Sequence, residues 1–288
     1  MSPLQLLTHP GPRSEARFTA LPCHAQPVEL RLAAGMSFEK AVVQGFAEAG
    51  FTAGYLRLSG APCARLSYVI PAPAPGDGRA AWYSKTHVLD TAVISEAGLH
   101  LGMKQGAPFL HCHGLWSGPD GAQRMGHLLA PDSELAQEMT VQGWGITGAA
   151  LAVTPDPETG FDLFAPVVQG SSAGDGLPAL LCTLRPNEDP HALLAEAGAP
   201  LGRARIEGIG SLVHTSFEAS QLESYATEVL LRAGRLTGDS VILNAASVGF
   251  DGAPMAGVLR PHGNRICITA EVLLIGDQTR GPLGDSAP

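Results

Sequence analysis

The stretch MSFEKAVVQGFAEAG, residues 36–50, predicts an amphipathic helix. Its apolar side chains Phe38, Val42 and Phe46 recur every four residues, the spacing of one helix face. Ser37 stands where a helix N-cap is expected, and Gly50 follows the end. Elsewhere, 35 glycines, 23 prolines and only 16% charged residues indicate many turns and short strands, so an all-helical protein is excluded.

A second stretch, NEDPHALLAEAG at residues 187–198, predicts a similar helix far along the chain. Asp189 is the expected N-cap, Pro190 occupies the first helical position and Gly198 ends the pattern. Leu193 and Leu194 are expected on the buried side. The same helical pattern therefore occurs twice in the sequence.

The segments that follow each helix also correspond. GYLRLSG (54–60) matches ARIEGIG (204–210), and TAVISEAG (91–98) matches ATEVLLRAG (226–234). Each of the latter pair precedes an apolar strand, a turn with Asp-Gly and another strand. An internal duplication explains this order. The predicted fold class is α+β, with two repeats of an antiparallel β-sheet, each packed with a helix.

The small polar residues of QGSSAGDGLP mark a linker between the repeats. The resulting prediction is an N-terminal extension at 1–27, a first domain at 28–168, a linker at 169–178, a second domain at 179–275 and a flexible tail at 276–288.

Charge and cysteine content narrow the functional classes. The net charge is −9, and the lysines are only Lys40, Lys85 and Lys104, so no basic run is available to follow nucleic-acid phosphates. Five widely spaced cysteines without a CxxC pattern indicate reduced core residues. The N-terminus has no charged segment followed by a long apolar stretch, so no leader is expected. No eighteen apolar residues run together, so no membrane span is expected, and cytoplasmic localisation is the default.

Three of the ten histidines fall within FLHCHGLWSGPDGAQRMGH, residues 109–127. The segment predicts a β-hairpin whose turn is centred near Asp120. Strand alternation then places His111 and His113 on one face. Residue 127 is as far from the turn centre as residue 113, so His127 is expected directly opposite His113, about 5 Å away between Cβ atoms. The three imidazoles should converge.

Such a cluster favours a divalent metal, most plausibly zinc, because neutral imidazoles bind zinc well and three of them leave a fourth position open. The alternative is that unrelated histidines come together by chance. An acid near the metal could act as a base or orient a histidine. The preferred acid is Glu134; the others considered are Asp90, Asp120 and Asp132.

The matching hairpin of the second repeat, VILNAASVGFDGAPMAGVL (241–259), provides an internal comparison. Asn244, Ala246 and Val258 stand where the first repeat has histidines, and together they make no metal site. If the three histidines served only to stabilise the repeat, both copies would need them. The histidines are therefore interpreted as a site carried by the first repeat, with the second kept for architecture.

These motifs resemble the plants and prokaryotes conserved (PPC) domain family. The resemblance runs from LRLAAGMSFEKAVVQGFAEAGF through YLRLSGAPCARLSY, HCHG and MGHLL to FDLFAPV, covering most of residues 28–168, and residues 179–275 look like a divergent second copy. It implies an α+β domain that assembles as a trimer, with metal-binding histidines at His111, His113 and His127. Plant relatives carry an AT-hook, but here TRGPLG lacks its second arginine.

Three functions follow as hypotheses. The first is a zinc protein whose open position serves a small-molecule or anionic ligand, metal-assisted hydrolysis or lyase chemistry. The second is a DNA-binding regulator, which acidic charge opposes. The third is a structural assembly module in which metal tightens a hairpin. A homo-oligomer is expected in each case, and sedimentation of a monomer at micromolar concentration would contradict it.

Overall fold

The computed structural model describes residues 6–170 and 175–277. In the first half the elements are β1 (Phe18–Leu32), α1 (Phe38–Glu48), β2 (Gly54–Val69), β3 (Pro71–Ala72), β4 (Trp82–Tyr83), β5 (His87–Leu89), β6 (Ala92–Lys104), β7 (Ala107–Ser117), β8 (Gln123–Leu128), a 3₁₀ turn (Ala130–Asp132), β9 (Glu134–Leu135), β10 (Met139–Asp156) and β11 (Phe161–Gln169).

The second half contains β12 (Leu177–Leu184), α2 (Pro190–Gly198), β13 (Arg203–Val213), β14 (Thr215–Ser216), β15 (Gln221–Leu222), β16 (Thr227–Thr237), β17 (Ser240–Val248), β18 (Pro254–Val258) and β19 (Arg265–Gly276). Of the predicted linker, residues 171–174 lie outside the described residues, as does most of the predicted tail. The predicted domain boundaries stay a prediction.

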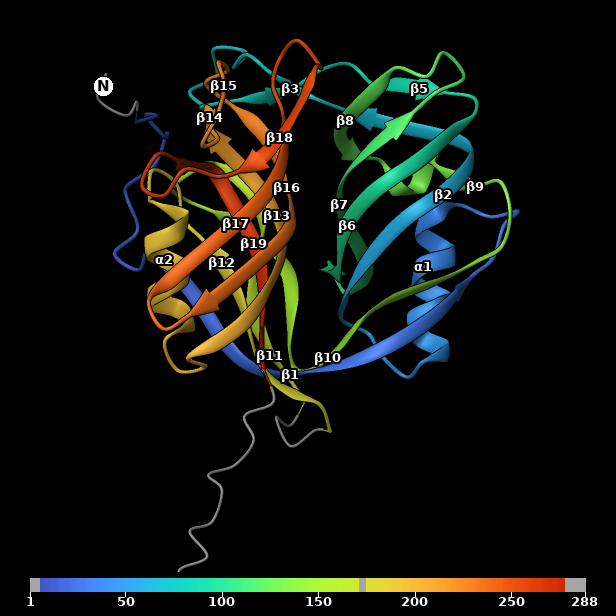
Figure 1. The fold of residues 1–288 in the computed structure, drawn as a ribbon, viewed down its shortest axis with the longest axis horizontal. Coiled ribbons are helices and arrows are strands. Elements are labelled where there is room, and N and C mark those ends of the chain that lie inside the picture. The colour runs from blue at the N-terminus through green and yellow to red at the C-terminus, as the bar shows by residue number, and fades with distance from the viewer. Residues whose placement is uncertain (1–5, 171–174, 278–288) are drawn as a thin grey trace, which may run out of the picture.

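Both predicted helices form with the expected caps. The Ser37 hydroxyl accepts the backbone N–H of Lys40, and the Asp189 carboxylate accepts the N–H groups of His191 and Ala192. The buried face of α1 packs into the first-half core, and Leu193 and Leu194 of α2 pack into the second-half core. Figure 1 shows the two helices on opposite outer sides of the molecule.

The predicted α+β class is wrong. The protein is mostly β: the described residues contain only two α-helices, of 11 and 9 residues, against strands of up to 18 residues. The two halves also do not have separate sheets. Their strands belong to one 15-stranded sheet, mixed through a single parallel bridge between β10 and β6, and Figure 1 shows β1 running beneath both halves.

The strand that joins the halves is β1, which begins inside the predicted N-terminal extension. Residues 18–25 pair with β12 of the second half, and residues 24–32 pair with β10 of the first half. This strand contains two prolines, Pro22 and Pro27, and each lies where β1 has one neighbouring strand. A proline is tolerated there because its missing N–H can face the unpaired side.

The inner faces of the two halves pack against each other through a small apolar cluster. It contains Leu115 and Met125 from the first half, with Ile209, Leu230, Ala246 and Val248 from the second. Because strand residues alternate between faces, the same face of β7 that carries Leu115 also carries His111 and His113. The histidines therefore face the second half of the chain.

Arg17, just before β1, also ties the halves together. Its guanidinium lies 2.9 Å from Glu158 of the β10–β11 turn and 2.9 Å from Glu188 before α2. The side chains of Arg17 and Glu158 are only 11% and 5% exposed. Burial raises the pKa of Glu158, but hydrogen bonds from Arg17 and from the Ser14 backbone outweigh this and lower the pKa overall.

Replacing Arg17 with methionine is expected to lower the free energy of unfolding by about 3 kcal/mol, because Glu158 and Glu188 lose their common partner. Arg31→Met is the control, since Arg31 and Glu138 form an exposed pair whose loss costs at most about 1 kcal/mol. The lowered pKa of Glu158 stabilises the fold at neutral pH, so the cost of Arg17→Met should shrink as pH falls through that pKa. Urea unfolding at several pH values measures the loss of unfolding free energy and its pH dependence. A loss in Arg17→Met that stays constant with pH would contradict the pairing of Arg17 with Glu158.

Candidate metal centre

The β7–β8 hairpin has the predicted register. His113 pairs with His127, and Ser117 pairs with Gln123 on either side of the turn. The ring centroid of His111 lies 4.8 Å from that of His113 and 4.9 Å from that of His127. One potential ligand atom from each of the three residues lies within 4.8 Å of the others. The local sequence pattern was thus sufficient to predict the cluster.

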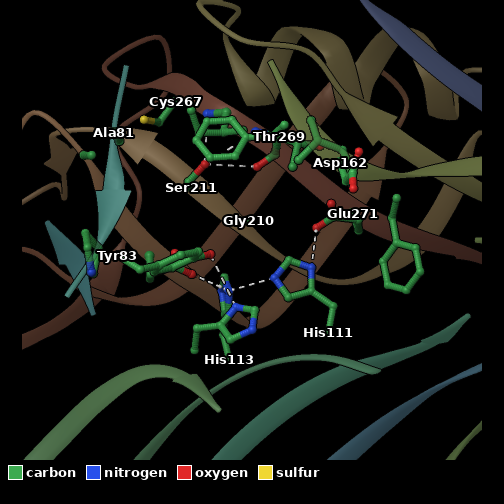
Figure 2. Close-up of a pocket in the computed structure, with 18 of the residues that line it drawn as sticks. Ala81, Tyr83, His111, His113, Asp162, Gly210, Ser211, Cys267, Thr269 and Glu271 are labelled. Atoms are coloured by element: carbon green, nitrogen blue, oxygen red, sulfur yellow. Dashed lines mark hydrogen bonds and ion pairs between the residues drawn. The ribbon is translucent and has the colours of Figure 1, made fainter. Parts of the chain in front are cut away.

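The second half of the chain supplies the groups that fix the orientation of two rings. His113 Nδ1 lies 3.0 Å from the backbone oxygen of Val229 on β16. His111 Nδ1 lies 3.3 Å from Glu271 Oε2 on β19, and Figure 2 shows this contact beside the pair of histidines. A carbonyl only accepts hydrogen bonds, so His113 Nδ1 must carry a proton. Glu271 Oε2 makes no hydrogen bond within the described part of the chain, but its position beside His111 Nδ1 favours the same tautomer there. In the neutral form of each ring, this leaves the Nε2 atom as the lone-pair donor.

Those two Nε2 atoms face each other at 3.1 Å. Two lone pairs at that distance repel unless a positive charge lies between them, either a proton or a metal ion. Glu228 of β16 adds a carboxylate to the same point, since its Oε2 is in direct contact with His113 Nε2. Two convergent imidazole nitrogens beside a buried carboxylate, with a third histidine nearby, form a donor set that suits a divalent transition metal.

The pKa values in the cluster are strongly perturbed. Burial lowers the pKa of His127 well below its ordinary value, and neighbouring His111 and His113 lower it further. Burial also disfavours charged His113, but its contact with Glu228 outweighs this and raises the pKa of His113. For Glu228, burial is outweighed by His113, and the pKa of the carboxyl falls below its usual range. Glu228 is therefore ionised at neutral pH.

Tyr83 of β4 covers the cluster from one side. Its hydroxyl lies 3.4 Å from His127 Nδ1. Burial of the hydroxyl and the nearby Glu228 charge raise the pKa of Tyr83, although 39% of the residue as a whole is exposed. Tyr83 therefore stays protonated and can donate a hydrogen bond into the site.

Behind the cluster, His100 of β6 holds the strand that carries Glu271. Its Nε2–H donates to the backbone oxygen of Glu271 at 3.1 Å, and the residue is fully buried. Burial lowers the pKa of His100 to about 4, so the ring is neutral at physiological pH. Its contacts make it a positioning residue for Glu271.

The structure does not bring the sequence-predicted acids to the histidines. Glu134 lies on β9, paired with Arg65 of β2, and does not line the cavity at the cluster. Asp90 and Asp132 also lie away from it, and Asp120 is bound by Arg124 in the turn. The carboxylates at the site are Glu228 and Glu271, both from the half interpreted as architectural. That interpretation missed the contribution of the second half because side-chain contacts between halves leave no local periodicity.

A sequence signal for these acids did exist. Both glutamates precede the same tripeptide inside apolar strands, as TEVLL at 227–231 and AEVLL at 270–274. A glutamate in a strand buried on both faces is almost never left unpaired. The pattern could therefore have marked both as partners of a buried cation or histidine.

The cluster lies at the inner end of a cavity of about 190 Å³. Its walls are mostly apolar, and Figure 2 shows groups from both halves around it. The larger apolar side chains of the wall include Phe109, Val153, Phe161, Leu163, Phe164 and Ile268. Phe164 is 5% exposed, and its ring centroid lies 6.2 Å from that of His111.

The fold and the site define a class: a mostly β protein with a histidine-rich cavity between its halves.

No family model matches the sequence, and no curated protein matches it. Of the described residues, no helix is long and apolar enough to span a bilayer.

Several solved structures are similar to about half of the chain. A metal-containing protein from Archaeoglobus fulgidus is 24% identical, with 49% of this chain and 94% of that chain covered and a TM-score of 0.38. A PPC protein from Pyrococcus horikoshii is 14% identical, with 55% and 100% covered and a TM-score of 0.37. A protein from Ralstonia eutropha JMP134, provisionally named as DNA-binding, is 14% identical, with 48% and 89% covered and a TM-score of 0.38. The neighbours thus include the family that the sequence resembles.

The contact between Glu271 and His111 gives a direct prediction. Glu271→Gln removes the negative charge that His111 faces and should weaken zinc binding about 10- to 100-fold, the usual effect of losing a partner behind a metal ligand. Glu134→Gln is the matched control, because Glu134 lies away from the cavity, and it should bind zinc as the native chain does. Competition with a zinc-sensitive dye measures both affinities. Equal affinities for the two variants would exclude a role of Glu271.

Proposed function

We propose that this protein binds one zinc ion through His111, His113 and His127 and uses it to act on a small molecule in the adjoining cavity. The observation that carries the proposal is the pair of facing Nε2 atoms. His113 Nδ1 is hydrogen-bonded to Val229 O and His111 Nδ1 lies against Glu271, which favours Nε2 lone pairs directed at one point. This is how metal-binding histidines are oriented by groups behind them.

Zinc held by three histidines would supply a Lewis acid and an activated water at its open position. The chain's own residues have distinct tasks in such chemistry. Glu228 is ionised, contacts His113 and lines the cavity, so its charge can accept a hydrogen bond from a bound molecule and orient it. The Tyr83 hydroxyl can donate a hydrogen bond to the Glu228 carboxylate. The apolar wall excludes bulk water, which strengthens these polar interactions. Hydrolysis and lyase chemistry both fit this arrangement.

The DNA-binding alternative needs cations free to contact phosphates. Several arginines of the described residues are instead committed to carboxylates within the fold. Arg17 binds Glu158, Arg185 binds Asp156 and Arg232 binds Glu96. These pairs favour the small-molecule proposal over a phosphate-contacting surface. Assembly as a trimer and a cytoplasmic location are further proposals, the first of which sedimentation would test.

Metal content is the deciding experiment. The native chain and His127→Ala should be purified without a metal-affinity column, and their zinc measured by mass spectrometry. We expect about one zinc per native chain and a large loss in the variant, because the third ligand is gone. His262→Ala is the control, since His262 is 77% exposed and lies in the second half. Zinc absent from the native chain even after it is supplied would overturn the proposal.

A further inference from the structure

The charge balance of the cavity limits what it can bind. At its inner end lie two buried carboxylates, Glu228 and Glu271, with side chains 6% and 1% exposed. A divalent metal ion on three neutral histidines would therefore be compensated fully by the protein itself. An added anion would meet no net positive charge there.

The mouth of the cavity adds no attraction for an anion. Among its lining residues in the described part of the chain, Lys104 is the one lysine and there is no arginine; Asp162 offsets Lys104, and both of these side chains are exposed. Arg79 lies over the rings of Trp82 and Phe161 and is paired with Asp77. Since exposed charges are screened by water, neither sign dominates the approach. The cavity is thus electrically balanced at both ends and apolar between them.

The size of the cavity sets the second limit. Its volume is about 190 Å³, and a cavity of about 150 Å³ lined by apolar side chains holds a benzene molecule. The Phe109 and Phe164 rings stand edge to face with centroids 5.7 Å apart, and His111 adjoins Phe164. A single ring or a short branched chain fills this space, with room for one polar group beside the histidines.

From these limits we infer that the ligand is an uncharged molecule with a ring-sized apolar body and one carbonyl-type group that reaches the metal centre. The inference rests on the proposed function, since the metal supplies the charge that the two carboxylates balance. Amides, esters and aldehydes of about this size belong to the class. An anionic ligand, which the sequence alone left open, is disfavoured by Glu228 and Glu271.

The test uses benzamide, an uncharged amide with one ring, and benzoate, an anion of similar size and shape. Calorimetric titration of the zinc-loaded chain should show tighter binding of benzamide than of benzoate. Acetamide has the same carbonyl-type group without the ring, and should bind at least about tenfold more weakly than benzamide because it buries less apolar surface.

Glu228→Gln removes one negative charge without changing the shape of the side chain, so the zinc-loaded site gains a net positive charge. In this variant benzoate should bind about tenfold more tightly than to the native chain, whereas the affinity for uncharged benzamide should change little. A merely structural effect would shift both probes in the same direction and would contradict the inference.

The outcomes separate the inference from the proposal beneath it. Zinc content is measured on each titrated sample. If zinc is bound but benzoate binds as tightly as benzamide, or neither binds, the inference about the ligand is wrong and the metal site stands. If the native chain binds no zinc, both are overturned.

Discussion

Zinc is expected to stabilise the native chain by about 4 kcal/mol when free zinc exceeds its dissociation constant 1,000-fold, because the ion binds the folded state and the ligands separate on unfolding. His113→Ala should abolish nearly all of this gain. His113 is the ring that contacts both His111 and Glu228, and its side chain is 2% exposed. Urea unfolding of chelator-stripped protein, with and without added zinc, measures the difference.

Two comparisons make the result specific. The variant His262→Ala should keep the full zinc effect, since this exposed histidine contacts Asp189 and lies outside the cluster. His113→Ala also changes the metal-free protein, so only the increment on adding zinc is compared. An equal increment in native and His113→Ala chains would place the bound zinc elsewhere.

The second large effect concerns the packing of the two halves. Ile209→Ala and Ile206→Ala are each expected to lower the free energy of unfolding by about 2 to 5 kcal/mol, because both side chains are at most 1% exposed. The two residues lie on the same strand, β13, but in different clusters. Ile206 packs in the second half's own core, whereas Ile209 packs between the halves beside Leu115 and Leu230.

Only Ile209→Ala should also weaken zinc binding. A cavity between the halves lets them shift, and Glu228 and Glu271 then lose their fixed distance from the histidines. Ile206→Ala removes a similar volume where no metal-site residue packs, so it is the matched control. Zinc affinity measured by dye competition on the folded variants distinguishes them. If both variants bind zinc equally, the site does not depend on the interface between halves.

Part of the fold was predictable because its signals are local. The caps Ser37 and Asp189 and the apolar spacing around them act within one or two turns of helix, so both helices were predicted correctly. The joining strand β1 was missed, because Pro22 and Pro27 are turn formers unless a strand edge accommodates them. Which edge is free is a property of the assembled sheet. The α+β class was wrong for the same reason, since the number and length of paired strands depend on distant partners.

The sequence by itself determined the histidine cluster. Strand alternation and a symmetric turn bring His113 opposite His127, and both effects act within twenty residues. Only the tertiary structure decided which acids join them. Glu228 and Glu271 reach the histidines from strands more than a hundred residues away, across an interface built by apolar packing. The sequence can mark these two acids as buried in apolar strands, but packing is non-directional and leaves no spacing that pairs them with the histidines, so that pairing becomes visible only when the halves are placed face to face.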